Sequence, residues 1–333
     1  MEQKKSLADK ILQALDEGGD YVSGQELCDR FGVSRTAVWK AVKTLKEKGY
    51  CFEALQNKGY RLIETPDSIE GAEIRKHLKT RWAGCKIHYF PETGSTNADA
   101  KRYAEAGDPH GTLLVTDDQQ SGRGRHGHTW SSPKGVNIAM SLILKPKFAP
   151  EYASRLTLIM GLAVAEGIRE VTGLDARIKW PNDTVIHGKK VTGILTEMSA
   201  EPDFIQYVIV GIGINVNSEV KDFPEEIRDM AGSLKTESGQ EQSRSKVIAA
   251  VMRYFEQYYE GFQKTLDLTG VKDRYEELLV NKDSTVRVLE KEPYEGTCLG
   301  IDRDGSLLVQ KTDGATVKVN AGEVSVRGMY GYT

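Results

Sequence analysis

Residues 121–130 read "SGRGRHGHTW" and bring glycines, arginines and a tryptophan together in a way that suits binding of an anion beside a flat ring. Glycines let backbone N–H groups approach an anion closely, and Arg123 and Arg125 can each donate paired hydrogen bonds to a phosphate or a carboxylate. Trp130 offers an aromatic face for a base or ring. A solvated surface loop is the alternative, but the density of these residue types favours a ligand loop that is mobile when empty.

The same stretch contains the spacing GxGxxG, which is typical of a dinucleotide-binding turn between a strand and a helix. An apolar strand is expected at residues 112–117, but Pro133 and Gly135 follow the glycines and the chain then enters another strand. No Gly-Lys-Ser/Thr sequence closes the stretch, so a phosphate-binding P-loop does not fit either. The context therefore excludes both nucleotide-binding folds and leaves a cationic glycine loop.

A second group of polar residues lies in "KWPNDTVIHGKKVTG" (179–193). Asn182 and Asp183 follow a stiff proline turn at a strand end, and Lys190 lies where the next strand begins. A surface ion pair between Asp183 and Lys190 explains these two residues equally well. Trp180 is interpreted as a core residue and Lys189 as a solvated one.

Two shorter motifs complete the set. In "TGSTN", Ser95, Thr96 and Asn97 supply small hydrogen-bonding groups where a helix is expected to begin, and helix capping is their alternative use. In "GIGIN", two glycines free the backbone near the end of a strand that Asn215 closes.

The totals describe an ordinary globular chain. The 333 residues suggest two or three domains, with 39% hydrophobic and 28% charged residues and a net charge of -3. The four cysteines form no CxxC pair, and neither a signal peptide nor a membrane-spanning apolar run is present, so we expect a cytoplasmic protein without membrane association. Nucleic-acid binding would need a local basic patch.

Residues 1–64 predict a winged helix-turn-helix domain. The pattern comprises an apolar helical face at 6–17, a helix capped by Ser23 and ended by Gly32, a basic helix capped by Ser34, and a hairpin near 50–62. Residues 34–61 hold seven Lys/Arg against two Glu, which favours DNA over the alternative of a protein-interaction module. The residues expected to contact DNA are Ser34, Arg35, Thr36, Lys40 and Lys43.

The remaining chain predicts an α+β organisation. Residues 64–68 form the expected linker, and the strands and helices between 65 and 280 predict a mixed, largely antiparallel sheet. Expected helices begin near Asn97 and cover 151–172, 245–262 and 271–280. Short strands separated by "DRDGS" and "KTDGA" predict a small β-barrel in residues 281–333.

Taken together, the motifs "GSTN", "QQSGRGRxGxxW", "KWPND", "GKKxxGIL" and "GIGINV" resemble those of biotin protein ligases. The resemblance covers nearly the whole chain in the domain order of the bifunctional members, which also repress biotin genes. It implies a multidomain α+β protein with an N-terminal winged helix-turn-helix, a central SH2-like mixed α/β catalytic domain and a C-terminal SH3-like β-barrel.

The resemblance also implies a two-step reaction: biotin and ATP form biotinyl-5'-AMP, and a lysine of a biotin carboxyl carrier protein then displaces AMP. The chemistry requires positioning and charge compensation, supplied by Mg²⁺ and cationic side chains, rather than a protein nucleophile. The implied catalytic residues are Lys190, Arg125 and Asp183. The implied biotin-binding residues are Ser95, Thr96, Asn97, Gln119, Arg123, Gly124, Arg125 and Lys190. The implied ATP-binding residues are Arg123, Arg125, Trp130, Asn182, Asn215 and Arg327.

No metal site made by protein side chains alone is expected, and Mg²⁺ would accompany ATP near Asn215. His126 and His128 stand where relatives often have arginine, which lowers the permanent charge of the loop. Further expectations are a homodimer, operator DNA as a partner, and biotinyl-5'-AMP as corepressor. A lipoate-type ligase on the same fold and a transcription factor that only senses biotin are the alternatives.

Overall fold

The computed structural model describes residues 6–18, 20–47, 49–55, 58–64, 66–127, 129–130, 132–289, 292–320 and 325–328, without the side chains of residues 64, 126 and 325–328. It forms two compact units, Met1–Asp67 (unit 1) and Ser68–Thr333 (unit 2). Among the described residues, no helix is long and apolar enough to cross a membrane.

Unit 1 is a three-helix domain with a two-stranded wing. Its elements are α1 (Leu7–Gly18), α2 (Gly24–Phe31), α3 (Arg35–Glu47), β1 (Cys51–Leu55) and β2 (Gly59–Glu64). Ser23 Oγ accepts a hydrogen bond from the N–H of Glu26 at 3.0 Å, and Gly32 ends α2 with a φ of 63°. Ser34 Oγ accepts from the N–H of Ala37 at 3.2 Å. The capped helices and the hairpin confirm the predicted winged helix-turn-helix.

Unit 2 is built on a seven-stranded sheet of order β3-β4-β7-β11-β10-β9-β8, in which only β3 and β4 are parallel. The sheet strands are β3 (Ile87–Phe90), β4 (Leu113–Thr116), β7 (Ile138–Leu144), β8 (Arg177–Lys179), β9 (Asp183–Ile186), β10 (Lys189–Ala200) and β11 (Ile205–Ile214). The α-helices are α4 (Gly71–His77), α5 (Thr96–Glu105), α6 (Arg155–Thr172), α7 (Leu234–Ser238), α8 (Arg244–Thr265) and α9 (Lys272–Leu278). The 3-10 turns are η1 (Arg125–Gly127), η2 (Pro150–Tyr152), η3 (Val220–Asp222) and η4 (Glu225–Ile227). The mixed, mainly antiparallel sheet confirms the predicted central fold.

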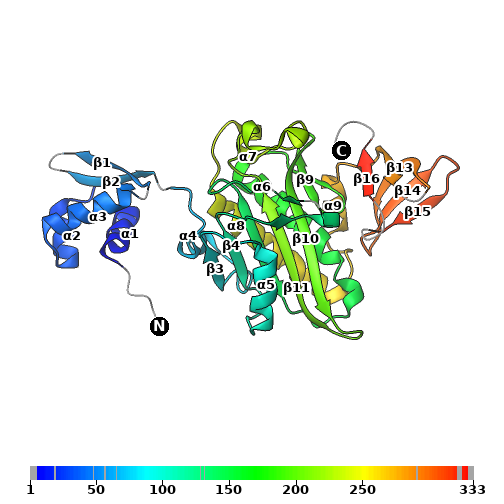
Figure 1. The fold of residues 1–333 in the computed structure, drawn as a ribbon, viewed down its shortest axis with the longest axis horizontal. Helices are drawn as coiled ribbons and strands as arrows, with labels where there is room; N and C mark the ends of the chain where they lie inside the picture. Colours follow the sequence, from blue (N-terminus) through cyan, green and yellow to red (C-terminus); the bar gives the residue numbers. More distant parts are fainter. Residues whose placement is uncertain are drawn as a thin grey trace. The chain divides into compact units, whose positions relative to one another are not determined.

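Alternating side chains on β11 divide the two faces of this sheet. Val208 and Val210 are buried in the core that includes α6 and α8, whereas Tyr207 and Ile209 pack against α5 on the opposite face (Figure 1). Further along β11, the α5 face carries Gly211 instead of a side chain, and Gly213 follows two residues later. This face of the sheet therefore has no β11 side chain at these two positions, and Asn97 and Trp130 lie over the bare backbone.

The C-terminal β domain has the strands β12 (Thr285–Leu289), β13 (Tyr294–Ile301), β14 (Leu307–Lys311), β15 (Thr316–Val319) and β16 (Ser325–Gly328). They form an antiparallel sheet of order β15-β14-β13-β12-β16. Apolar side chains such as Val286, Cys298 and Ile301 belong to the same buried cluster as α6. The small all-β C-terminal domain agrees with the predicted fold class.

The glycine loop contains a short hairpin that the sequence analysis did not predict. β5 (Gly122–Arg123) and β6 (Thr129–Trp130) form a short antiparallel hairpin around η1. A Cβ at Gly122 would lie 2.4 Å from the carbonyl oxygen of Trp130, so this pairing requires glycine. Alternation patterns failed here because the strands are only two residues long.

We predict that residues 68–333 fold without unit 1. The core of unit 1 consists of its own residues, including Ile11, Leu27, Val38 and Leu45, so its removal deprives unit 2 of no core side chain. Calorimetry of the fragment should show a cooperative transition within about 3 °C of the full-length value, the shift that roughly 1 kcal/mol produces in a domain of this size. A fragment without cooperative unfolding would contradict this independence.

Candidate active site

A cavity of about 800 Å³ opens on the sheet over β10, β11 and the start of α5. It brings together all four polar stretches of the sequence. The predicted residues that line it are Ser95, Thr96, Asn97, Gln119, Arg123, Gly124, Arg125, Trp130, Asn182, Asp183, Lys190 and Asn215. Residues up to 120 positions apart thus share one chamber, and their individual roles stay predictions.

The first end of the cavity (the ring end) presents amide and hydroxyl side chains that are already hydrogen-bonded to one another. Gln119 Oε1 accepts from the N–H of Thr96 at 2.9 Å, and Ser141 Oγ lies 2.8 Å from Thr96 Oγ1 and 2.6 Å from Asn97 Oδ1. Ser95 precedes α5, but its side chain makes no capping hydrogen bond. A Cβ at Gly211 would lie 2.2 Å from Asn97 Oδ1, so the strand beneath must be glycine there.

Glu197 is a site residue that the sequence analysis missed. Its carboxylate accepts from Asn97 Nδ2 at 2.7 Å and pairs with Lys101 Nζ at 2.6 Å. Burial alone would raise the pKa of Glu197, but the hydrogen bonds from Lys101 and Asn97 lower it overall, so the group is ionised at neutral pH. Its position on the cavity face of β10, four residues after Gly193, was the available signal.

Trp130 lies across the centre of the cavity floor. A Cβ at Gly213 would lie 2.3 Å from Trp130 Cε2, and a Cβ at Gly193 would lie 3.0 Å from its Cζ3. These two glycines are paired across β10 and β11. The indole Nε1 is buried and has no hydrogen-bond partner among the described residues. The flat ring therefore rests on the bare backbone of the two strands, with its Nε1 against Gly213.

The second end (the cationic end) holds Lys190, Arg125 and Asp183. Lys190 Nζ lies 2.6 Å from Asp183 Oδ1, with side-chain exposures of 26% and 12%. The ion pair considered from the sequence thus exists, but it lines the cavity rather than the outer surface. Arg125 Nη1 donates to Asn182 Oδ1 at 3.0 Å, and burial lowers the pKa of Arg125 while the charge of Asp183 opposes that shift. Buried Lys179 also lines this end and was missed.

The two ends are separated along one strand. Asn97 bonds to Glu197, and Lys190 lies seven residues earlier in β10. At about 3.3 Å per residue this spacing is on the order of 20 Å. Trp130, over Gly193, lies between them.

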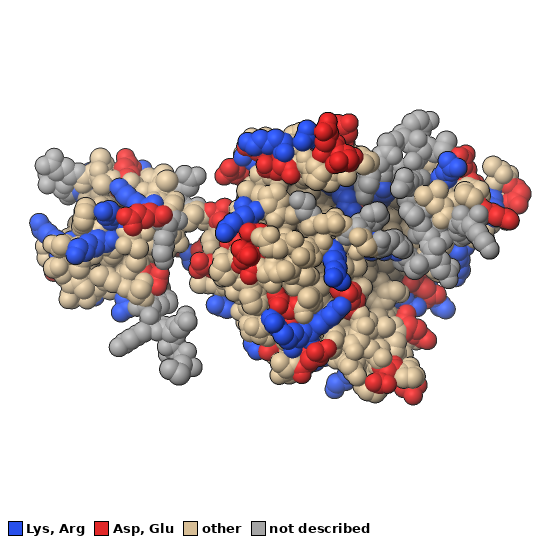
Figure 2. Space-filling view, viewed as in Figure 1, with Lys and Arg blue, Asp and Glu red and all other residues tan. Residues whose placement is uncertain are grey.

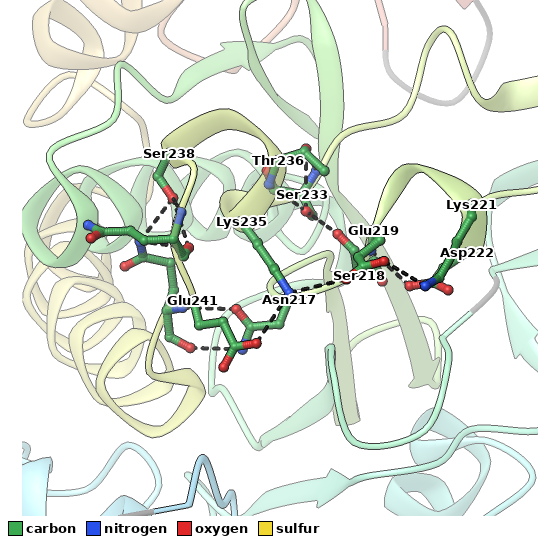
Figure 3. Close-up of polar contacts among 12 residues, drawn as sticks. Asn217, Ser218, Glu219, Lys221, Asp222, Ser233, Lys235, Thr236, Ser238 and Glu241 are labelled. Atoms are coloured by element: carbon green, nitrogen blue, oxygen red, sulfur yellow. Dashed lines mark hydrogen bonds and ion pairs between the residues drawn. The ribbon is translucent and has the colours of Figure 1, made fainter. Parts of the chain in front are cut away.

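A second segment, residues 217–242, contacts Asn215 at the cavity. Figure 3 shows polar contacts within this segment. Asn215 Nδ2 donates to the carbonyl of Gly232 at 3.0 Å, and Ser233 Oγ donates to the carbonyl of Ser218 at 2.6 Å. Lys235 bridges Glu219 at 3.4 Å and Glu241 at 3.2 Å. The segment contributes apolar cavity residues that the sequence analysis did not identify: Phe223, Ile227, Met230 and Ala231.

Arg244 fixes the stems of the glycine loop and was also missed. It is 2% exposed, and its Nη1 donates to Asp117 Oδ1 at 2.6 Å and to the carbonyl of Asn137 at 3.2 Å. Asp117 follows β4 and Asn137 precedes β7, so one buried cation holds the two ends of the loop. A charged residue at the start of the apolar helix α8 was its only signal in the sequence.

Three residues named in the sequence analysis lie wholly or partly outside the part of the chain that the structure describes. Arg327 is on β16 opposite Arg287, but its side chain is not described. The side chain of His126 and the whole of His128 are also outside the described residues. Two residues were predicted to lie outside the site. Trp180 is buried as expected, but it also borders the cavity. Lys189 pairs with Glu237 at 3.7 Å and does not line the cavity.

The candidate DNA-binding surface belongs to unit 1. Its predicted residues are exposed on or next to α3: Ser34, Arg35, Thr36, Lys40 and Lys43. Figure 2 shows Lys and Arg side chains on the visible face of this unit. Trp39, missed by the sequence analysis, is 54% exposed on α3, with Lys43 Nζ 5.6 Å from its ring centroid.

A cavity that brings cations to one end and hydrogen-bonding amides and hydroxyls to the other can hold two anions in contact while it orients one of them. On this mixed sheet, the arrangement defines a ligase of the biotin and lipoate class. Residues 89–215 match the biotin/lipoate A/B protein ligase family, residues 8–61 match an HTH domain, and residues 283–327 match the biotin protein ligase C-terminal domain.

Similar proteins narrow this class. The chain is 42% identical over 313 residues to the bifunctional ligase/repressor BirA of Bacillus subtilis (strain 168), which covers 93% of this chain and 95% of that protein. It is 29% identical to BirA of Escherichia coli (strain K12), over 95% of this chain and 96% of that protein. The solved biotin protein ligase from Aquifex aeolicus in complex with biotin and ATP has a TM-score of 0.64 at 30% identity, over 73% of this chain and 99% of that chain.

The chain therefore belongs to the biotin protein ligase family, and its near full-length relatives are bifunctional members that combine a ligase with a repressor. This confirms the family, the fold class and the ligase activity inferred from the sequence.

We predict that Lys190→Ala lowers the rate of adenylate formation roughly a hundredfold or more, because a positioned charge in a closed site contributes that much to rate. Release of pyrophosphate from ATP in the presence of biotin measures this step. Lys189→Ala removes the adjacent lysine, which does not line the cavity, and should retain near-normal release. Equal rates of pyrophosphate release for the two variants would show that Lys190 has no role in adenylate formation.

Proposed function

We propose that the chain condenses biotin with ATP to biotinyl-5'-AMP, transfers biotin to a lysine of a biotin carboxyl carrier protein, and represses transcription from operator DNA. The observation that carries the ligase part is the single cavity with amide and hydroxyl groups at its ring end and Lys190 and Arg125 at its cationic end. The ureido ring of biotin offers neutral donors and acceptors, whereas its carboxylate and the ATP phosphates are anions. One extended ligand of this kind matches both ends.

In the first step, the carboxylate attacks the α-phosphate and pyrophosphate leaves. The carboxylate is already ionised, so the enzyme must offset repulsion between two anions and align them. Arg123, Arg125 and Lys190 supply positive charge, while Asn182, Trp130 and Asn215 border the nucleotide. Mg²⁺ bound to ATP supplies further charge compensation, and the oxygens of Asn215 and Asp183 are of the hard type that this ion accepts. Arg327 is a further nucleotide contact in this proposal.

The ring end takes the ureido group in this proposal. Ser95, Thr96, Asn97 and Gln119 provide its hydrogen bonds, and Gly124 lets the loop backbone approach the carboxylate. Ser141 and Glu197 hold Thr96 and Asn97 in place, which lowers the entropy lost when the ring binds.

In the second step, the neutral amine of the acceptor lysine attacks the acyl carbon, AMP leaves, and the amine gives up a proton. Asp183 is the carboxylate at the cationic end that can orient this amine and accept its proton. Lys190, paired with Asp183, lies where it can contact the carboxylate-phosphate junction.

Biotin is favoured over lipoate because the named relatives and the C-terminal domain match are those of biotin ligases. The decisive experiment is incorporation of labelled biotin into a purified carboxyl-carrier domain, with lipoate tested in parallel. ATP-dependent transfer of biotin is expected, and lipoate transfer alone would refute the proposed substrate.

The repressor part rests on the winged helix and on a sheet edge suited to pairing. β9 pairs with β10 only at residues 189–193, so the rest of β10 is bonded to a strand on one side only, among the described residues. Met198, in that part of β10, is 44% exposed. A second copy of the chain can cover this edge and thereby present two recognition helices to a two-fold operator.

In this proposal biotinyl-5'-AMP acts as corepressor by ordering the glycine loop. The domain boundaries after residues 64 and 280 and the cytoplasmic location stay predictions of the sequence.

We predict that Arg125→Gly loosens the adenylate more than it slows its synthesis, because the half-buried guanidinium links the loop to Asn182. Escaped biotinyl-5'-AMP then acylates exposed lysines of bystander proteins. Biotin labelling of serum albumin in the presence of ATP measures this escape. Lys134→Ala removes an exposed cation from the same loop and should not increase labelling; equal labelling by both variants would argue against the role of Arg125.

We also predict that biotin plus ATP raises operator affinity roughly tenfold or more and shifts the protein toward dimer. Unmodified carrier domain should reverse the effect because transfer consumes the adenylate. The fragment 68–333 should lose operator binding and keep ligase activity. Sedimentation and operator titrations at one fixed salt concentration test this; identical dimerisation and DNA affinity with and without the adenylate would show that the glycine loop serves catalysis alone.

A further inference from the structure

Trp180 connects the cavity wall to the C-terminal β domain. Its side chain is 2% exposed, and its Nε1 donates to the carbonyl of Gly305 at 3.0 Å. Gly305 belongs to the turn Asp302–Ser306 between β13 and β14 and has a φ of 93°. A Cβ there would lie 3.0 Å from Leu158 Cδ2 and 3.1 Å from Leu268 Cδ1, so a larger residue would make the turn or the two leucines shift, and the positive φ also favours glycine.

The turn is fixed on both of its sides. Asp302 Oδ1 accepts from the N–H groups of Asp304 and Ser306, each at 2.9 Å. Arg155, at the start of α6, donates to Asp304 Oδ1 at 2.9 Å and to the Asp304 carbonyl at 3.2 Å. The carbonyl that receives Trp180 is therefore part of a rigid support rather than a loose loop.

On the other side of Trp180, the next residues form the cavity wall. Asn182 is held against Ile194 by two hydrogen bonds, from Ile194 N–H to its carbonyl at 2.9 Å and from its Nδ2 to the Ile194 carbonyl at 3.1 Å. Asn182 Oδ1 accepts from Arg125, and Asp183 pairs with Lys190. A displacement of Trp180 would move the two residues that contact the glycine loop and the catalytic lysine.

We propose that Trp180 is a positioning residue through which the turn Asp302–Ser306 holds Asn182 and Asp183 in register for adenylate retention and acceptor attack. The proposal rests on the proposed ligase function. The buried indole N–H needs an acceptor, and Gly305 supplies it. A misplacement of about 1 Å at a reacting group can lower a rate on the order of a hundredfold, so a small shift of this segment is enough to matter.

The geometry also predicts that the ring end of the cavity should not change when the contact between Trp180 and Gly305 is lost. Gln119, Thr96 and Asn97 lie on or next to β4 and α5, and their side-chain hydrogen bonds to other described residues involve neither Trp180 nor the turn. Loss of the contact should therefore affect the cationic end and leave the ring end intact. A general loss of stability would instead weaken functions of both ends together.

The test is Trp180→Phe in the full chain, which keeps an aromatic ring and removes the N–H donor. We expect transfer to the carrier domain to slow roughly tenfold and escape of biotinyl-5'-AMP to rise, with the KM for biotin within about twofold of wild type. The matched control is Trp82→Phe. Trp82 Nε1 donates to Glu260 at 3.2 Å, and Trp82 does not line the cavity.

Gly305→Ala is a second variant that perturbs the contact between Trp180 and Gly305 and leaves Trp180 itself unchanged. It should reproduce the slow transfer and the escape with the KM for biotin unchanged. Wild-type protein that fails to biotinylate the carrier would refute the proposed function itself. With an active wild type, the positioning role is overturned if Trp180→Phe behaves like Trp82→Phe, or if all steps weaken equally. It is also overturned if neither Trp180→Phe nor Gly305→Ala folds, since the contact would then serve folding alone.

Discussion

The absence of side chains at the centre of one sheet face is the constraint on which the site depends. Gly193, Gly211 and Gly213 leave bare backbone on β10 and β11, and Asn97 and Trp130 occupy the space where Cβ atoms would lie. Any larger residue at Gly211 would displace the side chain of Asn97, and any larger residue at Gly213 would displace the ring of Trp130. The cavity is therefore created by the strands themselves, and the loops above it only complete its walls.

Sequence reasoning identified the fold class because its signals are local and repeated. Caps at Ser23 and Ser34 mark the helices of unit 1, and short apolar runs such as residues 112–117 mark strands of the sheet. The motif residues were found for a similar reason: glycine, arginine and tryptophan in one short stretch are distinctive in composition. That composition could not reveal the β5–β6 hairpin, since two-residue strands have no period to detect.

The missed site residues share a different property, because their importance arises from partners that are distant in sequence. Glu197 acquires its role from Asn97 and Lys101, and Arg244 from Asp117, more than a hundred residues away. The sequence analysis explained the glycines of "GIGIN" by backbone freedom. The structure shows instead that glycine is needed there because Asn97 and Trp130 occupy the space of a side chain. Only the register of β11 against β10, which the sequence leaves open, shows which residues face the cavity.

The separate cores of the two units have a consequence for how such a protein can change over generations. A substitution at Leu27 or Val38 alters the packing of unit 1 alone, and the positions of Lys190 and Asp183 are set within the other core. Selection can therefore retune the recognition helix, or allow it to decay, while carrier modification is maintained. Drift in operator preference is then possible at little risk to the ligase activity.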